Sequence, residues 1–206
     1  MLLNRAYVAP QYHKIFYDYL YRFEKNNEEL IFIDGGVHQG VFTDIALACG
    51  GTVYGFEPNR FLSLFLRKLY KNNPKFIFFE AAIGAKAETL QFLDGGDGVI
   101  SQGGSVVHFT PEYKQCPTYN VQCVDFPQFV ADLIAKHGKI HFIKLDIEGA
   151  EFAVMDALLE RDLLQNVEYV MVETHERLFA DPEVTIQKLQ DKIAAKKLTN
   201  IHLDWI

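Results

Sequence analysis

Acidic, basic and histidine side chains gather at four points of the sequence, each at the end of a short apolar run. The segments are Asp34-Gly35-Gly36, Glu57-Pro58, Lys144-Leu145-Asp146-Ile147-Glu148 and Glu173-Thr174-His175. Carboxylates and imidazoles can accept hydrogen bonds from a ligand, move a proton or bind a metal ion. Because the carboxyl ends of parallel strands lie along one edge of a sheet, we expect these segments to line one ligand site.

Strands and helices that alternate along the chain would position these segments. Strands are predicted at 30–33, 52–56, 76–83, 141–145, 167–173 and 200–205. Helices are predicted near 11–26, 40–48, 60–71, 127–136, 150–160 and 183–197. Such alternation predicts an α/β fold, with a mainly parallel central sheet and helices on both faces.

We expect a single domain over residues 1–206, because no repeat and no linker divides the chain. Residues 1–28 form an N-terminal helical segment in this interpretation. Residues 90–124 are rich in Gly, Ser, Gln and Thr and predict an inserted hairpin whose loops contact the substrate. The predicted closing strand is short, so the sheet edge would be reduced or completed by a second copy in a homo-oligomer.

Composition argues against several classes of protein. The formal net charge of -7 and the lack of a Lys/Arg block argue against nucleic acid as a partner. The three cysteines form no CxxC pair, which disfavours a zinc site or a disulfide framework. The N-terminal region has no unbroken apolar stretch, so we expect neither a signal peptide nor membrane insertion, and a cytoplasmic location.

The turn from Asp34 to Gly40, together with Glu57 at the end of the next strand, predicts a binding site for an adenosine-containing ligand. Gly36 and Gly40 would let the backbone approach the ligand, but they do not make the GxGxxG dinucleotide fingerprint. Asp34 could accept a hydrogen bond from the α-amino group of an amino-acid moiety. Glu57 could accept hydrogen bonds from ribose hydroxyls; alternatively, it is a solvated residue that caps the helix after Pro58.

The chain resembles the FkbM family of methyltransferases over roughly residues 30–175. The resemblance rests on five segments in the same order, 34–43, 56–59, 81–84, 143–151 and 172–175, of which Lys-x-Asp-x-Glu-Gly-x-Glu at 144–151 is the most specific. The resemblance implies a Rossmann-like methyltransferase fold and S-adenosylmethionine as methyl donor. It also implies O-methylation of a small-molecule or glycan acceptor, such as a sugar, a glycolipid or a secondary metabolite.

The same resemblance assigns the donor-binding residues. The methionine half would contact Asp34, Gly36 and Gly40, the ribose Glu57, and the adenine Ala81 and Ala82. The donor site would also include His38, Thr43, Pro58 and Asp146. The family usually has Asn at the position of His38, which is the one feature that supports an alternative, a donor-binding but inactive regulatory relative. A nicotinamide-dependent oxidoreductase is a further alternative, disfavoured by the missing fingerprint.

Transfer of a methyl group to an alkyl hydroxyl requires in-line alignment and either a general base or a metal ion. Asp146 is the first candidate for the base, with Glu148 beside it. Alternatively, Asp146 is the N-cap of the helix near Ala150. For Glu151 we favour a structural role, in which it complements the positive end of that helix.

The last segment offers a second pair of reactive groups. Glu173 and His175 could form a base with an orienting carboxylate, or two metal ligands beside Asp146, although the spacing alone predicts no metal site. Alternatively, His175 is a surface residue at the start of a loop. Lys144 could pair with a carboxylate, orient the acceptor or be structural. Other histidines, including His141, belong to no such group and are expected to be satisfied locally.

Overall fold

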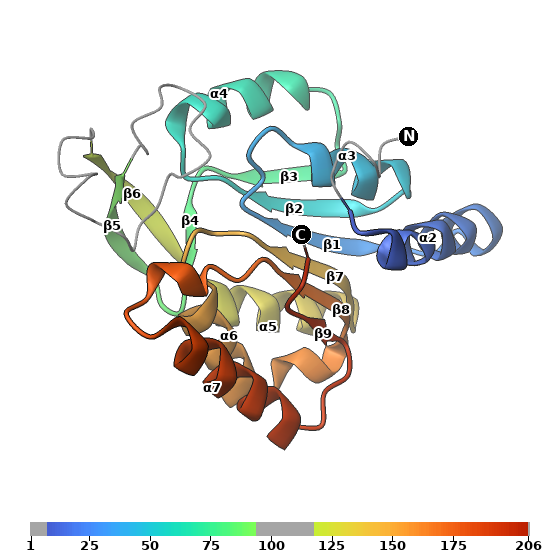
Figure 1. Cartoon of the computed structure of the whole chain (residues 1–206). Coiled ribbons are helices and arrows are strands. Elements are labelled where there is room, and N and C mark those ends of the chain that lie inside the picture. Colours follow the sequence, from blue (N-terminus) through green and yellow to red (C-terminus); the bar gives the residue numbers. More distant parts are fainter. Residues whose placement is uncertain (1–7, 94–117, 206) are drawn as a thin grey trace.

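A six-stranded parallel sheet forms the centre of the protein, which is represented by a computed structural model that describes residues 8–93 and 118–205 (Figure 1). The strand order is β3-β2-β1-β7-β8-β9, and every pair is parallel. The strands are β1 Ile31–Gly35, β2 Thr52–Phe56, β3 Phe76–Phe79, β7 Ile140–Leu145, β8 Val167–Val172 and β9 Ile201–His202. The predicted Rossmann-like α/β architecture is confirmed.

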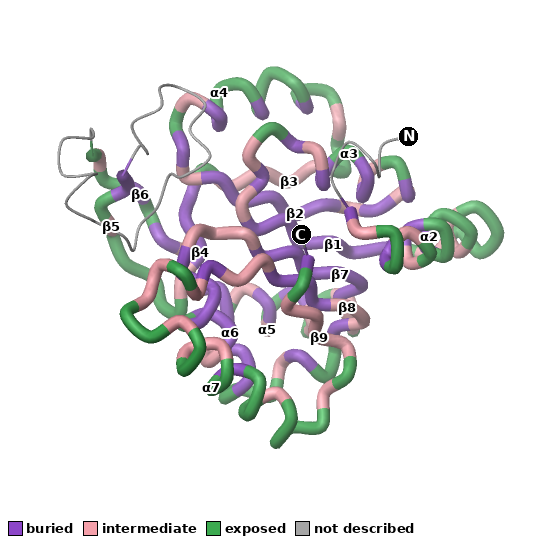
Figure 2. The backbone as a smooth tube through the Cα atoms, in the orientation of Figure 1, coloured by how far each residue is buried: buried purple, intermediate pink, exposed green. Residues whose placement is uncertain are grey.

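Helices cover both faces of this sheet because successive strand side chains point to opposite sides. Ile31 and Ile33 of β1 belong to the core under α5, α6 and α7, whereas Phe32 belongs to the core under α2 and α3. The inner strands β2, β1, β7 and β8 are mostly buried, the edge strands β3 and β9 are partly buried, and the outer helix surfaces are exposed (Figure 2). The α-helices are α2 His13–Asn26, α3 Val41–Ala48, α4 Arg60–Leu69, α5 Phe126–His137, α6 Glu151–Glu160 and α7 Pro182–Ala195. Short 3-10 helices are η1 Pro10–Tyr12, η3 Leu163–Asn166 and η4 Glu176–Leu178.

A second sheet of three strands corrects the prediction of one strand over 76–83. Strand β3 ends at Phe79, and the chain continues as β4 Ala82–Gly84, which pairs in parallel with β6 Thr118–Asp125. A continuous apolar run gives no signal of where its pairing partner changes. Strand β5 Glu88–Leu93 pairs antiparallel with β6, so the strands of the predicted hairpin are confirmed. Its loop residues 94–117 lie outside the described residues.

The closing strand is shorter than the predicted 200–205. β9 contains only Ile201 and His202, and Asp204 then makes an isolated antiparallel bridge with Glu173. The chain leaves the sheet here because Trp205 is buried in the core formed with α2 and α3. The sheet edge is therefore reduced. Within residues 8–93 and 118–205, no helix has the length and apolarity needed to cross a bilayer.

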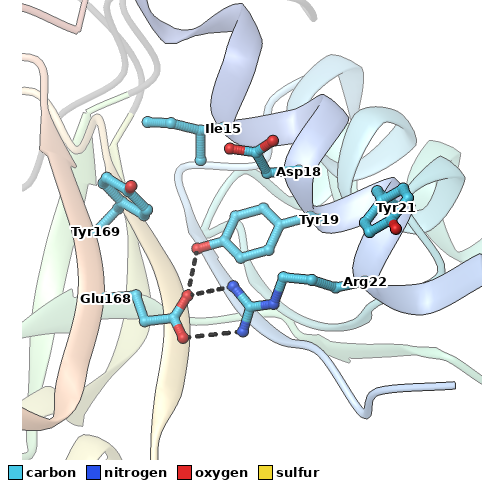
Figure 3. Close-up of a pocket in the computed structure, with 7 residues that line it drawn as sticks. All are labelled: Ile15, Asp18, Tyr19, Tyr21, Arg22, Glu168 and Tyr169. Carbon is cyan, nitrogen blue, oxygen red and sulfur yellow. Dashed lines mark hydrogen bonds and ion pairs between the residues drawn. The ribbon is translucent and has the colours of Figure 1, made fainter. Parts of the chain in front are cut away.

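Helix α2 is fastened to the amino ends of β7 and β8 by a charged network. Arg22 pairs with Glu28 at 2.6 Å and with Glu168 at 2.8 Å, and the hydroxyl of Tyr19 donates to the backbone oxygen of His141 at 2.5 Å. A pocket of about 290 Å³ lies beside this network, between α2 and β8 (Figure 3). Two of its charged lining residues, Arg22 and Glu168, are paired with each other and hold α2 against β8.

We expect this network to make stability sensitive to acid. Partial burial alone would raise the pKa of Glu168, but hydrogen bonds from Arg22 and Lys139 lower it to about 2. A depressed carboxyl pKa stabilises the fold above the unfolded value of about 4.3, and this contribution is lost as the pH falls through the folded pKa. Glu168→Gln should therefore cost about 1–2 kcal/mol at pH 7 and lose less stability between about pH 4.5 and 2.

Urea unfolding followed by circular dichroism at several pH values measures both effects. The matched control is Glu24→Gln, at an exposed position of α2, and this variant should unfold like the wild type. An equal loss of stability in acid for wild type and Glu168→Gln would show that this network does not set the acid sensitivity.

Candidate active site

The four polar segments meet at the carboxyl edge of the sheet, as predicted. Backbone hydrogen bonds join them directly: Gly36 N donates to Phe56 O at 3.1 Å, Asp146 N to Gly35 O at 3.1 Å, and Glu173 N to Leu145 O at 2.9 Å. The chain winds from β1 to β2 on one side and returns to β7 on the other, so the direction of winding reverses between β1 and β7. Ligands of open α/β sheets bind at such a reversal.

The glycines of the first turn are required by the packing of the chain itself, which differs from the predicted reason. Gly36 has φ +79°, and a Cβ there would lie 1.9 Å from the carbonyl oxygen of Asp146. Gly40 has φ +86°, and a Cβ there would lie 2.3 Å from the hydroxyl of Tyr70. Both glycines therefore allow the β1–α3 turn to pack closely against its neighbours, and their contact with a donor stays a prediction.

Asp34 and Lys144 form a buried charged pair beneath this turn. Asp34 is fully buried, accepts from the Thr43 hydroxyl at 2.6 Å and lies 3.5 Å from Lys144 Nζ. Burial raises the pKa of Asp34, although Lys144 and Thr43 oppose this effect. Lys144 also donates to Gly36 O at 2.6 Å and pairs with Asp146 at 3.2 Å. The structure thus gives Lys144 the predicted pairing with carboxylates and gives Asp34 a position that supports the turn.

Glu57 is buried and holds the turn through its carboxylate. It accepts from His38 N at 2.8 Å and from Asn59 N at 2.9 Å, and burial raises its pKa to about 7. The alternative of a solvated Glu57 that caps the next helix is wrong, because Asn59 caps α4 through Phe61 N and Leu62 N.

Two buried polar atoms near the turn lack a hydrogen-bond partner, which fits a polar ligand bound here. These atoms are Asp34 Oδ1 and His38 Nε2, two of the three such side-chain atoms found among the described residues. Burial lowers the pKa of His38, so its imidazole is neutral at pH 7. Native proteins rarely leave buried polar atoms unsatisfied. We therefore find the residues of this turn compatible with a bound adenosyl donor.

Pro58, Ala81 and Ala82 lie close to this turn. Pro58 is half-buried directly after Glu57, whereas Ala81 and Ala82 are buried where the chain passes from β3 to β4. Glu57 N donates to Phe79 O at 3.1 Å, which brings the end of β3 next to Glu57. Their predicted contacts with the donor stay predictions.

His175 faces a group of carboxylates on the other side of the reversal point. It is only 1% exposed, so the alternative of a surface residue is wrong. Its Nε2 lies 3.4 Å from Glu148, 3.7 Å from Glu173 and 4.0 Å from Asp146. Burial alone would lower the pKa of His175, but the surrounding carboxylates, foremost Glu151, raise it to about 9. Burial raises the pKa of Glu148 to about 7 and also raises that of Glu173.

Glu151 lies in the first turn of α6, as the structural role predicted for it requires, but it also has contacts that the sequence did not predict. It is fully buried, and it accepts from Ile147 N and Gly149 N at 2.8 Å and from His175 Nδ1 at 2.8 Å. It therefore shapes the turn after β7 and orients the imidazole. Asp146 does not cap α6, since the N-cap residue is Ala150 and no side chain bonds there. The only signal for Glu151 was its place in the Lys-x-Asp-x-Glu-Gly-x-Glu segment.

Comparison with known proteins agrees with this geometry. The family model of the methyltransferase FkbM domain matches residues 34–195, which include all four polar segments. Neither a curated protein nor a solved structure matches the chain. Since the matched region covers more than half of the sequence, the chain belongs to the FkbM methyltransferase family.

Proposed function

We propose that this protein transfers a methyl group from S-adenosylmethionine to a hydroxyl oxygen of a sugar, glycan, glycolipid or secondary metabolite. The observation that supports this most is the convergence of Asp34, Glu57, Asp146 and Glu173 at the reversal point of the sheet in an FkbM methyltransferase. The two described cysteines, Cys49 and Cys123, are free and buried, which is consistent with a reducing cytoplasm.

The donor half of the site would be the turn after β1 together with Glu57. S-adenosylmethionine supplies a methyl group activated by its sulfonium. His38 Nε2 offers an unpartnered polar atom to the donor, and the Glu57 carboxylate can accept from ribose hydroxyls in addition to its two backbone donors. Lys144 holds Gly36 and Asp146 in place, so the turn is ordered before the donor arrives.

The acceptor half would be the carboxylates after β7 and β8. Asp146, Glu148 and Glu173 are each partly exposed, with side-chain exposures of 27%, 22% and 28%, so an acceptor can reach them. A hydroxyl becomes a good nucleophile when its proton passes to such a carboxylate. Asp146 is our first candidate because it adjoins both the donor turn, through Lys144, and His175.

Calorimetric titration with S-adenosylhomocysteine tests the proposal, with NADH as the control ligand. Micromolar binding of the former alone, about -8 kcal/mol, would support the donor site. Binding of NADH instead would favour an oxidoreductase. Donor binding with no turnover in a broad acceptor screen would favour an inactive regulatory relative.

Glu57→Ala should weaken the binding of S-adenosylhomocysteine by about 10–100-fold, or about 1.4–2.8 kcal/mol. The variant loses the acceptor for ribose hydroxyls and also the acceptor that holds His38 N. Calorimetry measures the affinity, and circular dichroism shows whether the fold persists. Glu80→Ala is the matched control, because Glu80 follows β3 but is exposed and pairs only with Arg67 in the described contacts. Equal affinities of Glu57→Ala and wild type would remove Glu57 from the donor site.

A further inference from the structure

Two groups of one histidine and two carboxylates have ligand atoms close enough to share a metal ion, among the residues that the structure describes. One group is Asp146, Glu148 and His175 at the carboxyl edge of the sheet, and the other is Glu28, His141 and Glu168 at the amino edge. In each group the ligand atoms lie within 4.8 Å of one another. The hydrogen bonds of the two imidazoles distinguish them.

The imidazole of His141 has its metal-binding nitrogen blocked by a proton. Its Nδ1 accepts from the backbone N–H of Ile31 at 2.9 Å, so the ring proton lies on Nε2, which faces Glu28 at 3.2 Å. The two carboxylates are also paired with Arg22 and Lys139. This group is therefore a closed structural network. The hydrogen bonds of His141 confirm the prediction that its ring nitrogens have partners within the fold.

The imidazole of His175 has the opposite arrangement. Its Nδ1 lies 2.8 Å from Glu151, whose ionised carboxylate accepts, so Nδ1 donates and Nε2 is the nitrogen that binds a cation when the cation displaces its proton. Histidine ligands of metal ions generally donate their other ring N–H to a carboxylate or carbonyl in this way. Glu151 is fully buried and fixed by two backbone N–H groups, so the orientation of the ring is set by the fold.

The spacing around Nε2 fits the first coordination shell of an ion. Nε2 lies 3.4–4.0 Å from oxygens of Glu148, Glu173 and Asp146, which exceeds the usual hydrogen-bond length of about 2.7–3.2 Å. Ligands at about 2.1 Å from an octahedral cation are separated by about 3.0 Å when adjacent and about 4.2 Å when opposite. A cation among these atoms would therefore require only small shifts of the side chains.

We propose that His175 Nε2, Asp146 and Glu148 bind a divalent cation of the Mg²⁺ or Mn²⁺ class, with Glu173 next to it. Three carboxylates and one imidazole form an oxygen-rich set with no thiolate, which suits these ions better than a thiolate-bound zinc. Lys144 and Arg177 are the neighbouring cations, at 3.2 Å from Asp146 and 4.0 Å from Glu148. These two cations neutralise only part of the negative charge of the three carboxylates, and the remaining charge attracts an ion.

The chemical use of this ion rests on the proposed function. An acceptor hydroxyl bound to the cation would have a lowered pKa. With Asp146 serving as a ligand of the ion, the hydroxyl proton would pass to Glu173 instead of Asp146. The oxygen would then form a bond to the methyl carbon while the bond from that carbon to sulfur breaks. The sulfonium becomes a neutral thioether, and the proton remains on Glu173 until it is released to water.

Titration of the chelator-treated protein with Mn²⁺, followed by electron paramagnetic resonance, tests the site without an acceptor. The wild type should bind one Mn²⁺ per chain, and His175→Gln and Glu148→Gln should each weaken binding by at least about tenfold. Glu168→Gln, in the other group, is the matched control and should bind Mn²⁺ like the wild type. Circular dichroism of each variant identifies a loss of fold.

Absence of Mn²⁺ binding by the wild type at millimolar concentration would overturn the proposal. Unchanged binding by both folded variants His175→Gln and Glu148→Gln would also overturn it and indicate an adventitious ion only. Calorimetry with S-adenosylhomocysteine in the presence of chelator separates the two proposals. Binding of this ligand without Mn²⁺ binding would leave the methyltransferase proposal standing, and the converse would leave the metal site standing.

Discussion

Replacement of Gly36 by alanine is expected to destabilise the protein by about 3 kcal/mol or more and to abolish donor binding. The new Cβ would lie 1.9 Å from the carbonyl oxygen of Asp146, a contact that a backbone atom can relieve only by moving. The residue also has φ +79°, which strains any side chain. The turn after β1 and the turn after β7 would both shift, and they hold the two halves of the proposed site.

Gly138→Ala separates the two causes of this effect. Gly138 has φ +81°, but a Cβ there meets nothing within 4 Å. The variant should therefore lose only the stability that a positive φ costs a residue with a Cβ, about 1–2 kcal/mol. Urea unfolding measures both losses, and titration with S-adenosylhomocysteine measures donor binding. Equal losses in the two variants would show that the contact with Asp146 is unimportant.

Asp146→Asn is expected to reduce turnover by about 10²–10⁴-fold while donor affinity changes by less than about tenfold. Asparagine keeps the shape of the side chain but can neither take a proton nor bind a cation as a carboxylate does, and it loses the ion pair with Lys144 at 3.2 Å. Lys144 would still donate to Gly36 O at 2.6 Å and lie beside Asp34, so the donor turn should persist.

A screen with radiolabelled S-adenosylmethionine would supply an acceptor for this measurement. Turnover and the affinity for S-adenosylhomocysteine are then compared between wild type and variant. Asp156→Asn is the control, because Asp156 is a partly exposed carboxylate on α6 that pairs with Lys192. Unchanged turnover in Asp146→Asn would remove this residue from the proposed chemistry.

Much of the fold and the location of the site could be predicted because they depend on local pattern. Apolar runs in alternation with amphipathic stretches predicted the parallel sheet and its helices, and the residues directly after each run predicted its carboxyl edge. Lys144, Asp146 and Glu148 share one such segment, so their proximity needed no knowledge of distant contacts. The same segment supported the resemblance to the FkbM family, which the match over residues 34–195 confirms.

Other features depended on contacts between residues far apart in the sequence. The apolar run at 76–83 does not show that its second part pairs with β6. A glutamate in the first turn of a helix is usually solvated, yet Glu151 is buried because His175 and two backbone N–H groups meet its carboxylate. The imidazoles of His141 and His175 also differ in what faces Nδ1, which is a backbone N–H in His141 and a carboxylate in His175.

The sequence by itself therefore determined the alternation of strands and helices along the chain, the family and the chemical groups available at the edge of the sheet. The tertiary structure decided which groups are buried, which nitrogen of each histidine faces a fixed hydrogen-bond partner and which carboxylates face one another. The physical reason is that periodicity and motif are properties of neighbouring residues. Burial, hydrogen-bond partners and pKa shifts are instead set by atoms that approach only when distant segments pack together.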